Sequence, residues 1–528
     1  MTTTEANKYK VFIPTAGLGT RMGNIGLKFN KSLATVTTKP VISHIVEKFK
    51  DDIEIVVALG HNGDYVKDFL ELGYPEKKFT FVKIDPFCGP GSGLGLTMLQ
   101  CKDHLQAPFI FCSNDTLTSS QIKPPDRNWM AYDEVHDNIS YRSIRRNEEG
   151  KVLKIFEKNE IEYSLAYVGL AGIHDFKLFW KFMEDGKDFG SISSGECYAL
   201  SKMLNHTNIE SEKIDWFDTG QPKGLALAKK YYSKSSDPKI LQKDDEAIWF
   251  VKDRVIKFST DKKFISDRVE RAKILEGYTP PMIESRENMY CYRKVNGRVL
   301  SSCINKKLSQ NFFDWMSEFW KVELEKPPKI TDFKVACTSF YKDKSISRVQ
   351  KFLSRYSFAD TPHNINGEVV PRLDDLLSQI DWDWICNSEP TNFHGDFHFE
   401  NILLSETGSF VLLDWRQNFG GYKNFGDKYY DLAKLLHGMI VSHDMVSKDM
   451  FDIQIDDDVV KFEIHRKYTL VECEKQFKRF CLKSGLEYKK ILVITALIFL
   501  NIAALHHDPY SKFLFYLGKY RLHEALQK

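Results

Sequence analysis

The chain has 528 residues, 42% of them hydrophobic and 13% aromatic, which is ample material for packed cores. At typical domain sizes of about 100 to 200 residues, this length corresponds to roughly three domains or to two larger ones, and we favour two. The formal net charge of +2 excludes a global positive field that would attract nucleic acid, so anionic partners have to be held by local charges.

Cysteine usage and hydropathy indicate a cytoplasmic protein with reduced thiols. The ten cysteines show neither Cys-x-x-Cys pairs nor zinc-like spacing, and residues 1–10 lack the apolar core of a secretory signal. The longest apolar run, Ile491–Leu505, falls short of the about 20 residues that cross a bilayer, so we expect a buried helix and no membrane insertion. No nucleic-acid partner is expected, and the sequence does not indicate an oligomeric state.

The first part of the chain alternates strands with helices. Strand character is found at Tyr9–Pro14, Ile53–Leu59 and Phe109–Cys112, with helical patterns at Val41–Phe49 and Tyr65–Leu72. This alternation predicts a largely parallel α/β sheet, whose ligand site lies at the carboxyl ends of its strands.

A glycine turn follows the first strand directly. Gly17, Gly19 and Thr20 are small enough for backbone N–H groups to approach phosphate oxygens, and Arg21 and Lys31 supply positive charge. The turn therefore predicts a phosphate-binding site at the end of this strand.

Two alternatives to this interpretation of the turn stay open. A dinucleotide-binding loop would need the spacing G-x-G-x-x-G and an acidic residue about 20 residues later. Here the third glycine is displaced to Gly23, and residues 37–41 contain no acid. The other alternative is a glycine turn with a purely structural role.

The turn begins a series of motifs that resembles the sugar-phosphate nucleotidyltransferases, whose signature is G-x-G-T-R, then P-K-x-L, then a K-P pair. Residues 17–21, 30–33 and 39–40 match it, except that Asn30 replaces the family's proline. The likeness continues through Ser92–Gly95, Asn114-Asp115, Glu157-Lys158, Ala166–Gly169, Gly195-Glu196 and Trp216–Gly220, and so covers residues 9–232.

This resemblance implies a Rossmann-like nucleotidyltransferase domain that works with Mg²⁺. A phosphate monoester, whose second pKa is about 6, attacks the α-phosphorus of a nucleoside triphosphate and expels pyrophosphate, so cations matter more than a general base. Arg21 and Lys31 would hold the triphosphate, assisted by Gly17, Gly19, Thr20 and Gly93. Asp115 and Asp218 would bind the metal, and Glu157, Lys158 and Gly169 would contact the phosphorylated substrate. For Asp115 alone, an ordinary Asx-turn after a strand is the alternative.

A polar, proline-containing stretch, Ser233–Pro238, is the best domain boundary. We therefore expect a first domain over residues 1–233, a linker over 234–240 and a second domain over 241–528. Since few contacts cross such boundaries, the two halves are expected to fold separately.

The second half contains a kinase-like catalytic loop. Asp396 is followed by Asn401 with four residues between them, and the apolar run Phe410–Leu413 leads directly to Asp414. In phosphoryl transfer, the first aspartate orients or deprotonates the substrate hydroxyl, while the asparagine and the second aspartate hold Mg²⁺.

The amino-terminal part of this half predicts a small lobe over about 241–310. Residues 247–251 and 254–258 are typical of a hairpin around Asp253, which would make Lys257 the ATP-phosphate lysine and Glu270, on the next helix, its ion-pair partner. No glycine-rich loop precedes the hairpin, and an exposed strand lysine is the alternative for Lys257. From Phe312 onward helical periodicity dominates, which fits a helical large lobe over about 311–528.

The stretch from His394 to Ala433 resembles the aminoglycoside phosphotransferase and choline kinase family. Its motif is H-G-D, then x-H-x-x-N, then a strand that ends in Asp-Trp, and residues 394–401, 414–415 and 426–433 match it. The resemblance implies a protein-kinase-like α+β bilobal domain with ATP as phosphate donor.

Together the two halves predict a bifunctional enzyme. The second domain would phosphorylate a small hydroxylated compound, with a sugar or polyol favoured, and the first would couple the product to a nucleotide from a second NTP, giving a precursor for surface polysaccharide. A choline or ethanolamine kinase fused to a cytidylyltransferase is the main alternative. Two others are a transferase with a regulatory pseudokinase domain and a protein that only senses nucleotides. The sequence does not indicate which NTP base is used, which compound is phosphorylated or whether the intermediate is channelled.

Overall fold

The computed structural model describes residues 9–22, 28–135, 140–158, 160, 165–234, 245–322, 325–357 and 359–527. Contacts divide the chain into two compact units. The first contains residues 1–265 and 283–294, and the second contains residues 266–282 and 295–528. Gly23 and residues 235–240 of the expected linker lie outside the described residues.

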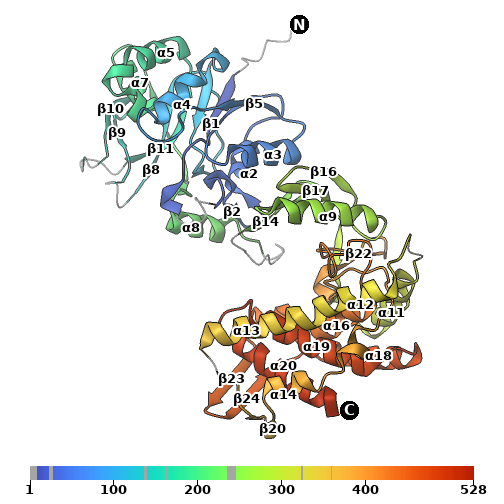
Figure 1. Ribbon diagram of the computed structural model, residues 1–528. Coiled ribbons are helices and arrows are strands. Elements are labelled where there is room, and N and C mark those ends of the chain that lie inside the picture. Colours follow the sequence, from blue (N-terminus) through green and yellow to red (C-terminus); the bar gives the residue numbers. More distant parts are fainter. Residues whose placement is uncertain are drawn as a thin grey trace. The chain divides into compact units, whose positions relative to one another are not determined.

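A mixed sheet forms the centre of the first unit (Figure 1). β1 (Lys10–Pro14) pairs in parallel with β4 (Glu54–Leu59) and β6 (Phe109–Cys112), and β4 pairs in parallel with β5 (Lys78–Lys83). β11 (Leu165–Ile173) extends the sheet antiparallel to β6, and four further strands follow on that side. These are β8 (Trp129–Glu134), β9 (Ser143–Arg146), β10 (Val152–Phe156) and β12 (Glu210–Lys213). The three strands expected from the sequence are confirmed. The expectation of a largely parallel sheet is wrong, because β11 pairs antiparallel with β6, β8 and β9 and half of the sheet is therefore not parallel.

Helices cover both faces of this sheet. Side chains alternate along β1, so Val11 and Ile13 enter one core and Phe12 enters the other. The first core contains apolar residues of α2 (Val41–Val46), α3 (Gly63–Gly73) and α8 (Pro222–Tyr232). The second contains those of α4 (Leu94–Gln100), α5 (Phe176–Asp185) and α7 (Glu196–Met203). The expected helices at 41–49 and 65–72 are thus confirmed as α2 and α3.

A second, antiparallel sheet completes the first unit. β14 (Glu246–Val251) and β15 (Arg254–Ser259) form the expected hairpin, and β17 (Met289–Arg293) pairs with β15. Trp249 packs edge-on against Phe69 of α3 with ring centroids 5.0 Å apart, and Phe258 lies 5.0 Å from Phe29. This hairpin therefore shares a hydrophobic core with the α/β sheet.

We expect a fragment ending at Ser233 to be destabilised by loss of that shared core. Six buried residues of the small sheet belong to it: Trp249, Val251, Ile256, Phe258, Met289 and Cys291. Burying a large apolar side chain contributes about 1.5 to 3 kcal/mol, so removing this set costs about 10 kcal/mol, which is comparable to the whole stability of a typical domain. A fragment ending at Lys294 keeps all six.

Thermal melts of residues 1–233 and 1–294 measure this difference. The longer fragment should unfold cooperatively, and the shorter one should melt at least 10 °C lower or aggregate. Equal melting temperatures would show instead that the boundary expected at residues 234–240 separates independently folding halves.

Helices dominate the second unit, as the sequence predicts from Phe312 onward. They include α11 (Lys306–Trp320), α12 (Ile330–Thr338), α13 (Lys344–Tyr356), α16 (Lys428–Ile440), α18 (Tyr468–Lys483), α19 (Tyr488–Ala503) and α20 (Tyr510–Gln527). A turn of π-helix, Ser339–Asp343, joins α12 to α13. Asp427 caps the N-terminus of α16, because its carboxylate accepts a hydrogen bond of 2.9 Å from the backbone N–H of Tyr429.

The apolar run at 491–505 forms most of α19, which packs against α13, α16 and α20 and is buried as expected. Among the described residues, no helix is long and apolar enough to cross a membrane. A short sheet of β18 (Gly297–Val299), β21 (Ile402–Ser405) and β22 (Phe410–Leu412) belongs to this unit, and β21 begins directly after Asn401.

Candidate active sites

The glycine turn follows β1, and hydrogen bonds to the neighbouring strand β4 fix the backbone at the point where the turn begins. The hydroxyl and the backbone N–H of Thr15 both donate to the carbonyl of Ala58, at 2.7 and 3.0 Å. Gly60 is required for this approach, because a Cβ there would lie 2.4 Å from the Ala16 carbonyl oxygen. Gly17 has open space around it, whereas Gly19 has a φ of 66°, in the left-handed region that glycine tolerates.

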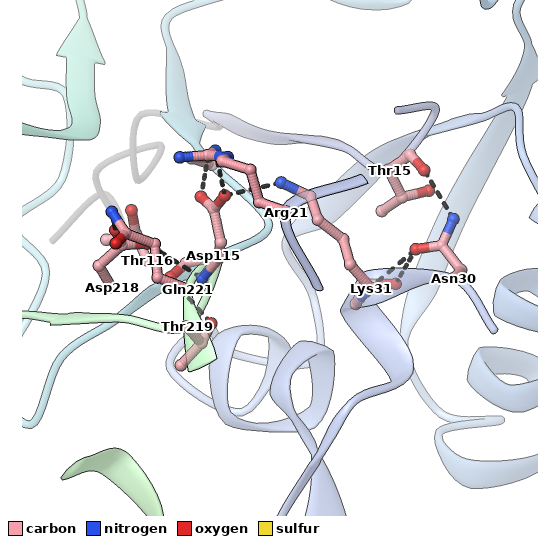
Figure 2. Close-up of polar contacts among 12 residues, drawn as sticks. Thr15, Arg21, Asn30, Lys31, Asp115, Thr116, Asp218, Thr219 and Gln221 are labelled. Carbon is pink, nitrogen blue, oxygen red and sulfur yellow. Dashed lines mark hydrogen bonds and ion pairs between the residues drawn. The ribbon is translucent and has the colours of Figure 1, made fainter. Parts of the chain in front are cut away.

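Asn30, at the position where the nucleotidyltransferase signature has proline, holds the loop before Lys31 in place (Figure 2). Its side-chain amide donates to the carbonyls of Thr15 at 2.8 Å and His61 at 2.7 Å. Its oxygen accepts from the backbone N–H and the hydroxyl of Ser32 at 3.0 and 2.7 Å. The side chain is fully buried, so these hydrogen bonds supply the rigidity that a proline would give.

Lys31 and Arg21 both point toward Asp115 (Figure 2). The Lys31 ammonium lies 2.6 Å from the Asp115 carboxylate, and the guanidinium of Arg21 lies 3.9 Å from it. Burial raises the pKa of Asp115, but the charge and hydrogen bond of Lys31 outweigh it and hold that pKa below its ordinary value. Asp115 is therefore a carboxylate. The Arg21 side chain is 58% exposed, so most of its charge faces solvent.

Asp218 comes close to Asp115 because β13 (Phe217–Asp218) pairs with β7 (Thr116–Leu117). Thr219 donates to the Asp115 carbonyl from its N–H at 3.0 Å and from its hydroxyl at 2.9 Å. A Cβ on Gly220 would lie 2.7 Å from an Asp115 carboxylate oxygen and 3.1 Å from one of Asp218, so the two carboxylates flank this glycine.

The pair is suited to Mg²⁺, a hard cation that takes oxygen ligands and is commonly held by one or two carboxylates together with substrate phosphates. Among the described residues, no group of three or more His, Cys, Asp or Glu side chains is placed to hold a metal ion. Asp218 is oriented by the Tyr141 hydroxyl at 2.9 Å and the Gln221 amide at 3.0 Å. Sequence reasoning missed Tyr141 and Gln221, which belong to no motif.

The other residues expected in the first site differ in how they are placed: one lies next to the segment of Asp115, two are exposed, and one is explained by packing. Gly169, with a φ of 71°, lies against the segment that carries Asp115, since a Cβ there would be 2.9 Å from that of Ser113. Glu157 is exposed and pairs with Arg142 at 2.9 Å, and Lys158 is exposed. Gly93 precedes α4 where a Cβ would lie 2.3 Å from a neighbouring carbonyl, so packing alone explains this glycine.

In the second unit, Asp431 of α16 fixes the backbone of the loop that begins at His394. Its buried carboxylate accepts hydrogen bonds from the backbone N–H groups of His394 at 2.8 Å and Gly395 at 2.7 Å. Burial raises the pKa of Asp431 to about 7. The His394 ring makes a 2.8 Å hydrogen bond with the Leu413 carbonyl, which ties the loop to the strand before Asp414.

Asp396 is held by three neighbours. The Asn401 amide donates to its carboxylate at 2.9 Å, the Lys434 ammonium lies 2.7 Å away, and the His398 ring lies 3.5 Å away. Burial raises the pKa of Asp396, but Lys434 and His398 hold it well below its ordinary value. The side chain is still 37% exposed, so an anionic carboxylate is available to a hydroxyl group.

His398 is an organising residue in this loop. It lies between Asp396 and Glu400, with a ring nitrogen 3.1 Å from the Glu400 carboxylate. Burial lowers its pKa, but the two acids outweigh burial and raise the pKa to about 9, so the ring is cationic at neutral pH.

The expected metal ligands Asn401 and Asp414 lie on neighbouring strand ends. The Leu413 N–H donates to the Asn401 carbonyl at 2.8 Å, and Asp414 follows with a φ of 58°. The Arg268 guanidinium lies 3.0 Å from the Asp414 carboxylate.

Lys257 and Glu270 belong to different compact units. Lys257 lies on β15 and is 8% exposed, so it is not an exposed strand lysine. Glu270 lies on α9 (Lys262–Ile274), as expected, and its carboxylate forms an ion pair with the Lys423 ammonium at 2.5 Å.

The N-terminal part of the chain is similar to known proteins. The N-terminal part matches the "Bifunctional protein GlmU" of Methanococcus vannielii, 24% identical over 43% of this chain and 55% of that protein. The chain thus spans about half the length of the curated relatives it matches. No protein-family model matches the chain.

Several solved structures align with less than half of the chain. The UDP-glucose pyrophosphorylase of Acinetobacter baumannii is 19% identical over 42% of this chain and 93% of that protein, with a TM-score of 0.35. The CTP:phosphocholine cytidylyltransferase of Streptococcus pneumoniae is 16% identical over 43% of this chain and all of that protein, with a TM-score of 0.37.

Proposed function

We propose that this protein is a bifunctional transferase: a small-molecule kinase whose product is the phosphate nucleophile of a nucleotidyltransferase on the same chain. The observation that supports the nucleotidyltransferase activity most directly is the convergence of four residues next to the glycine turn: Lys31, Arg21, Asp115 and Asp218. The GlmU proteins that match this part of the chain support the same class.

In the first site the protein's task is to bring two polyanions together. Lys31, and Arg21 beside it, oppose the repulsion between the triphosphate and the attacking phosphate monoester. Asp115 and Asp218 would hold Mg²⁺, which neutralises charge on the phosphate oxygens when bound. Tyr141 and Gln221 keep Asp218 in position. The monoester is already ionised at neutral pH, so no protein base has to remove a proton from it.

In the second site, the unprotonated Asp396 orients the acceptor hydroxyl and takes its proton. Asn401 fixes that carboxylate through its amide, and Asn401 and Asp414 would hold Mg²⁺ with the ATP phosphates. The chain keeps all three residues of the kinase-like motif, Asp396, Asn401 and Asp414. Asp396 is also anionic and accessible, which favours an active kinase over a pseudokinase.

Gly17→Ala tests whether the glycine turn binds phosphate. The protein leaves open space at Gly17, so alanine should change the free energy of unfolding by less than about 0.5 kcal/mol, as for other harmless substitutions. If a triphosphate approaches that backbone, the added methyl group should raise the KM for NTP about tenfold or more in a pyrophosphate-release assay.

Gly60→Ala is the matched control, because its methyl group meets the Ala16 backbone and should lower the melting temperature instead. Normal pyrophosphate release by Gly17→Ala would favour the structural glycine turn. No release by the wild-type protein with any NTP and phosphate ester would favour a nucleotide sensor.

A further inference from the structure

Basic side chains lie near the segment that carries Asp396. Lys434 makes the 2.7 Å ion pair with Asp396, and the charges of Arg416, Lys434, Arg348 and Asp396 all act on Lys344. Arg416 packs on the catalytic loop itself, since a Cβ on Gly395 would lie 2.5 Å from that of Arg416. We call Lys344, Arg348, Arg416 and Lys434 the acceptor-side cation cluster.

Arg348, Arg416 and Lys434 make the surroundings of Lys344 electropositive. Asp396 is the acid that acts on Lys344, and it is already paired with Lys434 and His398. Among the described residues, no carboxylate lies within ion-pair distance of Lys344, Arg348 or Arg416. Burial first, and then Arg416, Lys434 and Arg348, lower the pKa of Lys344 to about 6, while Asp396 opposes this, so without a bound anion this amine is largely unprotonated at neutral pH. An anion bound beside it would favour the protonated, cationic form of Lys344 and offset the repulsion among the four basic groups.

The aromatic faces beside the cluster are already covered by basic side chains of the protein. The Nζ of Lys344 lies 4.1 Å from the ring centroid of Phe340 and 5.9 Å from that of Tyr430. The Arg416 guanidinium lies 5.0 Å from the Phe340 ring. A quaternary ammonium ligand is recognised by such ring faces, so a cationic acceptor would have to displace both the Lys344 side chain and the Arg416 guanidinium.

The backbone next to Lys344 has an unusual conformation. Lys344 directly follows the π-helical turn Ser339–Asp343, which also carries Phe340. Turns of π-helix are rare and are frequent at functional sites. The π-turn places Phe340 where its ring meets Phe419 at 4.2 Å and Tyr430 at 4.8 Å, and Lys344 lies over the ring.

We propose that the acceptor-side cation cluster binds an anionic group of the acceptor, so that the kinase half phosphorylates an alcohol that already carries a carboxylate or a phosphate. This inference rests on the proposed kinase function and narrows it, because it excludes choline and ethanolamine. The acceptor hydroxyl oxygen forms a bond to the γ-phosphorus of ATP, and its proton passes to Asp396. The bond from that phosphorus to the β-γ bridging oxygen breaks, and ADP leaves with the electron pair.

A charge series of acceptors tests the inference on the full chain with ATP and Mg²⁺. Galactosamine, galactose, galacturonate and galactose 6-phosphate give cationic, neutral, carboxylate and phosphate versions of one sugar. Choline, glycerol, glycerate and glycerol 3-phosphate do the same for a small alcohol. ADP release should be at least tenfold more efficient, as kcat/KM, for an anionic acceptor than for its neutral and cationic counterparts. The carboxylate and phosphate arms show which anion is preferred.

Two variants test whether the acceptor-side cation cluster causes the preference for anionic acceptors. Lys344→Gln and Arg416→Gln should each lower kcat/KM for the anionic acceptor about tenfold or more, the effect of losing one charge-assisted hydrogen bond, and leave the KM for ATP within about twofold. Lys351→Gln removes an exposed lysine from the same helix and serves as the control. Calorimetric titration of the same acceptors, without ATP, should show binding to the wild type that Lys344→Gln weakens.

The outcomes separate the two proposals. A preference for choline or galactosamine would overturn the inference and leave the kinase function standing. A rise in the KM for ATP in Lys344→Gln, with unchanged acceptor KM, would also overturn it, since the cluster would then bind the donor. No ADP release with any acceptor would overturn the kinase function, and the inference with it.

Discussion

Replacing Asp396 with asparagine should lower ATP-dependent phosphorylation of the acceptor about 10²- to 10⁴-fold, the usual range for loss of a catalytic base. Asparagine keeps the size of the side chain and can still meet Asn401, but it cannot take a proton and does not neutralise Lys434, 2.7 Å away. Nucleotidyl transfer to a phosphate ester supplied from outside should stay at the wild-type rate, because it uses none of these residues.

Asp383→Asn is the matched control. Its carboxylate is 88% exposed and forms a surface ion pair with Lys334 at 3.0 Å, so both activities should be unchanged. ADP release and pyrophosphate release, measured separately for each variant, give the comparison. Kinase turnover close to wild type in Asp396→Asn would mean that the catalytic loop has been assigned incorrectly.

Lys31→Ala should have the converse effect. The variant loses the cation that opposes triphosphate repulsion, and Asp115 loses its 2.6 Å partner, so its pKa should rise. Removing one such electrostatic contact commonly costs about 10²- to 10³-fold in rate. In the coupled reaction, pyrophosphate release should fall by that factor and the phosphorylated intermediate should accumulate.

Lys28→Ala provides the control three residues away. Lys28 is paired with Asp245 at 2.7 Å and lies on the surface, so its loss should change neither activity. Finished product at the normal rate in Lys31→Ala, or no accumulated intermediate, would contradict the proposed first site.

Much of the first site could be predicted because it depends on strand ends. Asp115 follows β6 and the glycine turn follows β1, and parallel neighbours bring their carboxyl ends together. The consequence of Asn30 could not be predicted, because its partners Thr15 and His61 are distant in sequence. The same holds for the hairpin β14–β15, whose apolar residues are evident in the sequence although the core they join is not.

In the second unit, local spacing predicts that the candidate site residues lie close together, but it does not predict their surroundings. Asp396, Asn401 and Asp414 fall within one loop and one hairpin, so the motif alone predicts their proximity. Lys344 and Lys434 come from helices far away in the sequence. Lys434 reaches Asp396 from α16, and Lys344, at the start of α13, lies near enough for the charge of Asp396 to act on it; no spacing rule indicates either.

The fate of the γ-phosphate of ATP tests the central claim most directly. The full chain would be incubated with γ-³²P-labelled ATP, Mg²⁺, the preferred acceptor and a second, unlabelled NTP, and the products separated. If the kinase product is the nucleophile of the transferase, the label appears in the nucleotide-linked product, in the phosphate next to the acceptor, and the pyrophosphate from the second NTP is unlabelled. A nucleotide-linked product without label, or label found only in inorganic phosphate, would contradict the coupling of the two halves.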